Sequence, residues 1–79
     1  MDERTYSVIE LVGVSEYSYD DAVRRAIARA SHTLKGLGWY TITDLRGLIR
    51  DGEVAEYQVS LKIGFRLLRE DELQADASS

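Results

Sequence analysis

Trp39 is the only tryptophan in the chain, and it opens an alternating segment that continues through Tyr40, Thr41, Ile42 and Thr43. Neighbouring side chains of a β-strand point to opposite faces, so Trp39 faces away from a core that includes Tyr40 and Ile42. An indole outside the core exposes a large apolar surface, which usually marks contact with another molecule. The chemistry that this position predicts is stacking on a flat partner.

Other polar groups share the face of Trp39 in the predicted sheet. Alternation places on it Thr41, Thr43 and Leu45 from the same strand, and Gln58, Ser60, Lys62 and Arg66 from the next strand. A glutamine amide both donates and accepts hydrogen bonds, and an arginine can bind a phosphate through two N–H groups. This combination suits a flat aromatic ligand with a polar edge. A protein–protein contact is the commoner use of such a tryptophan, so the pattern alone leaves both interpretations open.

Asp44 and Arg46 have the parity of the core-facing residues Tyr40 and Ile42. Either the strand kinks before Asp44, or the two charged residues lie at its edge, and Gly47 makes a β-bulge an available explanation. Without a ligand, Asp44 and Arg46 would form a surface ion pair that adds little stability.

The sequence shows no pattern typical of a catalytic or metal site. His32 is the single histidine, and its neighbours Ser31 and Thr33 would face different directions on a helix. A glycine-rich phosphate loop, a nucleophile elbow and a pair of catalytic carboxylates are all missing from the pattern. We therefore expect a protein that is not an enzyme.

Composition limits the class of protein further. A chain of 79 residues forms one domain with a small core, and it has no cysteine for a disulfide, so self-association is the expected source of extra stability. The net charge of −4 argues against a nucleic-acid partner. No segment approaches the roughly 20 apolar residues of a membrane span, and the charged N-terminus is unlike a signal peptide. These features predict a cytoplasmic protein without nucleic-acid or membrane partners.

The elements that position the candidate residues follow from apolar spacing. Residues 6–12 predict a strand that ends at Gly13, and Ser18 is the expected N-cap of a helix about 18 residues long. Residues 39–49 and 57–67 predict two strands joined by an Asp51-Gly52 hairpin turn. The predicted fold is α+β, with β-α-β-β order and a three-stranded antiparallel sheet packed on one amphipathic helix. Residues 1–69 form the predicted domain, and residues 70–79 form a mobile polar tail.

Several segments, in order and with matching element lengths, resemble the dodecin family. They are residues 8–13, 22–23, 28–30, 33–40 (TLKGLGWY), 45–47 and 57–67 (YQVSLKIGFRL). The resemblance covers about residues 5–68. Tyr40 stands where phenylalanine is common and Leu48 where some members have histidine, so contacts near a ligand are expected to differ.

The resemblance implies a small protein that assembles into a hollow homododecamer and binds flavins, typically FMN in bacteria, or riboflavin or FAD. It implies that Trp39 stacks on the isoalloxazine ring, with two flavins between two symmetry-related Trp39 side chains. Gln58 then hydrogen-bonds the ring edge and Asp44 the ribityl hydroxyls, while Arg46 and Arg66 match positions associated with phosphate-bearing ligands. The expected function is flavin storage, sequestration and photoprotection. Coenzyme A or nucleotide binding, or a purely structural shell, remain the alternatives.

Overall fold

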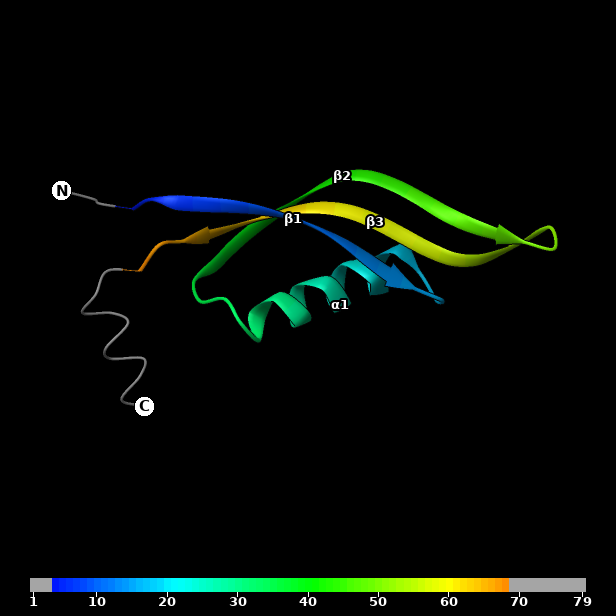
Figure 1. The fold of residues 1–79 in the computed structure, drawn as a ribbon, viewed down its shortest axis with the longest axis horizontal. Coiled ribbons are helices and arrows are strands. Elements are labelled where there is room, and N and C mark those ends of the chain that lie inside the picture. The colour runs from blue at the N-terminus through cyan, green and yellow to red at the C-terminus, as the bar shows by residue number, and fades with distance from the viewer. Residues whose placement is uncertain (1–3, 69–79) are drawn as a thin grey trace.

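The structure, a computed structural model, describes residues 4–68. It contains strand β1 (Tyr6–Ser15), helix α1 (Tyr19–Ser31), strand β2 (Leu37–Arg50) and strand β3 (Glu53–Arg66). Helix α1 lies against one face of the sheet, and the β2–β3 hairpin extends past the end of the helix (Figure 1). The predicted β-α-β-β order is confirmed. The tail predicted over residues 70–79 lies outside the described residues.

The sheet is antiparallel throughout, with the order β1-β3-β2. Strands β2 and β3 meet at Asp51 and Gly52, whose φ angles of 53° and 77° are those of a type I′ turn. Both central residues of this turn must adopt a left-handed backbone conformation. Asp and Gly tolerate that conformation better than most residues, so the Asp-Gly pair predicts the turn. The predicted three-stranded antiparallel sheet is therefore confirmed, with β3 as its central strand.

Strand β1 continues past its predicted end at Gly13. A Cβ built on Gly13 would overlap the carbonyl oxygen of Ala22 and lie 3.1 Å from the Cβ of Ala26. The glycine therefore lets α1 approach the strand closely and does not terminate it. Strand β1 turns Ile9 and Leu11 toward the core, whereas the flanking valines Val8 and Val12 are exposed.

Helix α1 begins where the sequence predicts but ends earlier. The Ser18 hydroxyl accepts a hydrogen bond from the backbone N–H of Asp21 at 2.9 Å and caps the helix. The helix has 13 residues and its C-cap is His32, so Leu34 and Leu37 lie beyond it although they continue its apolar spacing. Leu34 packs against the core from the connection to β2, and Leu37 does so as the first residue of β2. The predicted length of about 18 residues is wrong, because apolar spacing alone cannot distinguish a last helical turn from residues that pack on the core after the helix has ended.

A polar network ties the start of α1 to the end of β1. The buried Ser15 hydroxyl donates to Oδ2 of Asp21 at 2.5 Å, and Nε of Arg25 donates to the same oxygen at 2.6 Å. The Ser15 hydrogen bond, followed by that of Arg25, holds the pKa of Asp21 below its usual value. The backbone N–H of Tyr17 also donates to Ser15 Oγ at 2.9 Å, so one buried hydroxyl organises the whole turn.

The core lies between β3 and α1. The three most buried large side chains, Val59, Leu61 and Ile63, are 0–2% exposed and alternate along β3 as predicted. They pack against the small residues of the helix, Ala22, Val23, Ala26 and Ala30.

Helix α1 packs mainly on β1 and β3. Tyr40 and Ile42 of β2 remain 51% and 45% exposed although they face the helix side of the sheet. Strand β2 thus has no covering layer within the described part of the chain.

Candidate ligand-binding face

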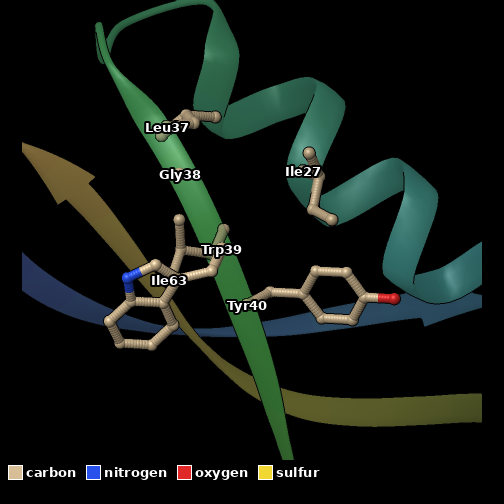
Figure 2. Close-up of a pocket in the computed structure, with 6 residues that line it drawn as sticks. All are labelled: Ile27, Leu37, Gly38, Trp39, Tyr40 and Ile63. Atoms are coloured by element: carbon tan, nitrogen blue, oxygen red, sulfur yellow. The ribbon is translucent and has the colours of Figure 1, made fainter.

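The indole of Trp39 lies on the face of the sheet opposite α1, here called the outer face. Trp39 is in register with Gly64 of β3, and 46% of its surface is exposed. Figure 2 shows the indole pointing away from Ile27 and α1, while Tyr40 points toward the helix side of β2. Trp39 therefore faces outward, as strand alternation predicts.

The indole rests directly on the backbone of β3. A Cβ built on Gly64 would overlap Cε2 and Cζ2 of Trp39 and lie 2.7 Å from its Nε1. The space that a side chain at position 64 would fill is thus occupied by the ring of Trp39. One side of the indole is covered by β3, and the remaining surface is open to a partner.

A second group of predicted residues forms a hydrogen-bonded cluster further along the same face. Arg46 donates through Nε to Oε1 of Gln58 at 2.9 Å, and through Nη1 to Oδ2 of Asp44 at 3.0 Å. Nη1 also lies 3.1 Å from Oγ of Ser60, and Nε2 of Gln58 donates to Oε1 of Glu56 at 2.8 Å. These bonds orient both the guanidinium and the amide before any ligand binds.

An irregularity in β2 places Asp44 and Arg46 on the outer face. The register shifts by one residue between Ile42 and Asp44, so Thr43 is the extra residue of a bulge, and its hydroxyl donates to the carbonyl of Ser60 at 3.2 Å. The alternative in which the strand kinks before Asp44 is thereby confirmed. The bulge is not at Gly47, which keeps a regular partner in Tyr57.

The same shift overturns the prediction for Leu45. Leu45 pairs with the buried Val59 and therefore lies on the helix side of the sheet, where it is 53% exposed. One inserted residue reverses the faces of all side chains beyond it.

Within one chain, the predicted site residues form two separate groups. Asp44, Arg46 and Gln58 are in contact, whereas Trp39 pairs with Gly64, six residues further along β3 than Gln58. At a rise of about 3.3 Å per residue, this separation is about 20 Å. Arg66 follows Gly64 by two residues and lies at the Trp39 end of the face, in register with Tyr6.

A small apolar hollow of about 150 Å³ adjoins β2 near Trp39. It is lined by Ile27, Leu37, Gly38, Trp39, Tyr40 and Ile63 (Figure 2). Ligand pockets usually measure about 300–1,000 Å³, so this hollow cannot enclose a ligand of flavin size. Ile27, Tyr40 and Ile63 belong to the helix side of the sheet, so this hollow is not a pocket of the outer face.

Two residues of the face have roles that the sequence pattern did not reveal. Glu56 accepts a hydrogen bond from the amide of Gln58 and so helps to orient it. Gly64 leaves the space beside β3 in which the indole of Trp39 lies. Counting the hairpin register back from Asp51-Gly52 would have paired Gly64 with Trp39.

Residues 4–68 carry neither a metal-binding cluster nor a membrane-spanning helix. That range holds no group of three or more His, Cys, Asp or Glu side chains that could bind a metal ion. Nor does it contain a helix long and apolar enough to cross a membrane.

Comparisons with known proteins agree with this geometry. The sequence profile of the dodecin family matches residues 5–68. A dodecin from Thermus thermophilus is 45% identical over 64 residues, which are 81% of this chain and 93% of that protein. The structure of dodecin from Streptomyces coelicolor is 51% identical with a TM-score of 0.84, and the match covers 89% of this chain and 100% of that one. Dodecin from Streptomyces davaonensis is 43% identical with a TM-score of 0.83, over 86% of this chain and 100% of that one. The chain therefore belongs to the dodecin family.

Proposed function

We propose that this protein binds and stores a flavin, with FMN as the principal ligand and riboflavin or FAD as related ones. The observation that carries the proposal is the indole of Trp39, which lies against the backbone of β3 at Gly64 while the residue remains 46% exposed. An exposed indole plane of fixed orientation is suited to stack on an isoalloxazine ring. Membership in the dodecin family supports the same ligand.

The polar cluster supplies the groups that a flavin needs beyond stacking. Gln58 uses one N–H on Glu56 and one oxygen lone pair on Arg46, which leaves one donor and one acceptor position for the ring edge. Asp44 is the proposed partner of the ribityl hydroxyls. The contacts described for Arg46 occupy Nε and Nη1, so its Nη2 group is the proposed donor to phosphate, together with Arg66.

Self-assembly brings the two groups of residues into one site in this proposal. The radius of gyration is 16.0 Å, well above the roughly 12 Å of a compact domain of this length. An elongated chain with an uncovered β2 is expected to bury its apolar surface against other copies. We propose a homododecamer in which two flavins stack between two symmetry-related Trp39 side chains.

Storage and photoprotection, and not catalysis, form the proposed role. A bound flavin is a redox-active and light-sensitive ring, and an electron-rich indole in contact with it quenches its excited state. The proposal assigns no general acid, base or nucleophile to the chain. The protein is proposed to act in the cytoplasm without nucleic-acid or membrane partners.

Coenzyme A or another nucleotide is the second candidate ligand. The separation of about 20 Å between Trp39 and the Arg46 cluster within one chain favours two independent binding functions on this face. If this candidate is correct, Trp39→Ala retains affinity for coenzyme A, whereas Arg46→Ala and Arg66→Ala lose it. In the third alternative, a purely structural shell, Trp39→Ala dissociates the oligomer.

The proposed function is tested by unfolding the purified protein and identifying the small molecules that it releases. The sample is first saturated with an equimolar mixture of FMN and coenzyme A and then freed of unbound ligand by gel filtration. Release of FMN supports flavin storage. Release of coenzyme A alone would transfer the proposal to the second candidate, and release of neither would leave the structural shell.

A further inference from the structure

We infer that Gly64 is a positioning residue of the ligand site, because its lack of a side chain sets the plane of the Trp39 indole. The inference rests on the proposed function for the identity of the ligand. Its structural part, the dependence of the indole orientation on position 64, is independent of any ligand.

The backbone of β3 does not itself require a glycine at position 64. Among the described glycines, positive φ angles occur only at Gly36 and Gly52, so an L-residue could adopt the conformation at position 64. A glycine inside a strand costs about 0.5–1 kcal/mol relative to alanine. Such a residue inside a strand indicates a bulge or close approach by another group. The extra residue of the register shift beside this pair is Gly38 of β2, and the group that approaches position 64 is the ring of Trp39.

The contact is specific to the side of the strand on which the ligand would bind. An added methyl group would overlap two carbons of the indole and lie 2.7 Å from Nε1, so the ring would have to tilt or move off β3. Figure 2 shows the indole on the side of β2 away from Ile27, where a stacked ligand would meet it. A tilted indole presents a different plane to the ligand and loses part of the stacking contact.

Gly38 provides a matched control. It precedes Trp39 in β2, and a Cβ at this position would lie 3.3 Å from Cε2 of Tyr6 and 3.6 Å from the carbonyl oxygen of Gly64. Gly38→Ala therefore adds the same methyl group one residue before Trp39, where none of the severe overlaps found at position 64 arises with these atoms.

The experiment compares wild type, Gly64→Ala, Gly38→Ala, Trp39→Ala and the Trp39→Ala/Gly64→Ala double variant. Near-ultraviolet circular dichroism of the ligand-free proteins reports the environment of the indole. Thermal unfolding reports the energetic coupling between positions 39 and 64, and FMN titration reports ligand affinity. We expect Gly64→Ala to change the indole bands and to weaken FMN binding roughly threefold to tenfold, and both effects should be smaller in Gly38→Ala. Gly64→Ala should lower Tm in the wild-type background and leave it unchanged or raised in the Trp39→Ala background.

Several results would overturn the inference. Unchanged indole bands in Gly64→Ala would overturn it. If wild type binds FMN, an equal FMN affinity of Gly64→Ala would overturn it as well. If Gly64→Ala does not fold, a folded double variant supports the inference, and an unfolded double variant contradicts it. A wild type that fails to bind FMN refutes the proposed function and the ligand role of Gly64 together, while the dichroism and unfolding data still decide whether position 64 sets the indole plane.

Discussion

The outer face concentrates its chemistry in a few side chains that are oriented before a ligand arrives. Trp39 is supported by the backbone at Gly64, and Gln58 is held between Arg46 and Glu56. Preorganised groups bind more tightly because less conformational freedom is lost on binding. Substitutions of these side chains are therefore expected to change ligand affinity more than the stability of the fold.

Replacing Trp39 with alanine should weaken flavin binding and leave the assembly folded. Loss of one aromatic stacking pair corresponds to about 0.5–1.5 kcal/mol, or roughly twofold to tenfold in Kd, and the lost contact area adds to this. The measurement is FMN titration combined with gel filtration of the same samples. An oligomer that dissociates in Trp39→Ala would favour the structural role of this residue instead.

Replacing Arg46 with alanine should weaken FMN binding more than riboflavin binding. The two ligands differ by the phosphate that Arg46 is proposed to bind, and loss of a charge-assisted hydrogen bond corresponds to about tenfold in Kd. Because the side chains of Arg46 and Asp44 are 47% and 57% exposed, the stability should change little. Parallel titrations with both flavins measure the difference. Equal losses for FMN and riboflavin would contradict phosphate binding and indicate that Arg46 acts by orienting Gln58.

The sequence predicts the placement of Trp39 and Gln58 because strand alternation alone determines it. It could not settle Asp44 and Arg46, because the bulge at Thr43 has no residue signature such as glycine. A register shift of opposite sense between Leu48 and Ile49 offsets the shift at Thr43. Strand pairs counted back from the hairpin turn are therefore correct at Trp39 and one residue off between Asp44 and Leu48. The error for Leu45 follows from this pair of irregularities.

At the scale of elements, the fold depends on how the ends of α1 and the strands are connected. The start of the helix was predictable because a serine N-cap followed by two aspartates satisfies the free N–H groups and the helix dipole. Its end was not predictable, because Leu34 and Leu37 contribute to the core from the connection and from the first residue of β2. The role of Gly13 was likewise not predictable. It allows α1 to approach β1 closely, and the residue pattern of β1 alone does not show where the helix lies.

The Ser15–Asp21–Arg25 network predicts a stability that depends on pH. Because the pKa of Asp21 is lower in the folded protein than its ordinary value of 3.8, the charged form stabilises the fold above that pH, and this contribution disappears as the pH falls through the folded-state pKa. Asp21→Asn should therefore lower Tm at pH 7, and the difference from wild type should close below about pH 3.8. Thermal unfolding across this range at fixed protein concentration measures it.

Glu10→Gln on the exposed side of β1 is the control, and its Tm should follow wild type throughout. A Tm difference for Asp21→Asn that persists unchanged into strong acid would show that the carboxylate charge is not the stabilising feature.

At the scale of the whole molecule, a single chain leaves much of its apolar surface uncovered. Large apolar residues stay exposed along β2 and at the hairpin, where Ile49 and Val54 are 74% and 60% exposed. The hollow beside Trp39 is too small for a flavin, and the molecule extends 54 × 26 × 13 Å. A flat, elongated subunit with apolar surface on both sides is suited to form part of a shell.

In solution, the protein should form a particle of twelve times the chain mass of 8.9 kDa. Burial of the apolar surface of β2 and the hairpin against neighbouring copies favours this assembly. Light scattering coupled to gel filtration measures the mass, with Ile49→Asp as a variant expected to reduce the assembled fraction. A stable wild-type monomer would contradict the proposed assembly.

The central claim is that the indole of Trp39 stacks on a flavin, and fluorescence titration of FMN with wild-type protein tests it most directly. The account predicts that FMN emission falls as protein is added and reaches a low plateau near one flavin per chain. FMN emission that stays unchanged at every protein concentration would contradict it.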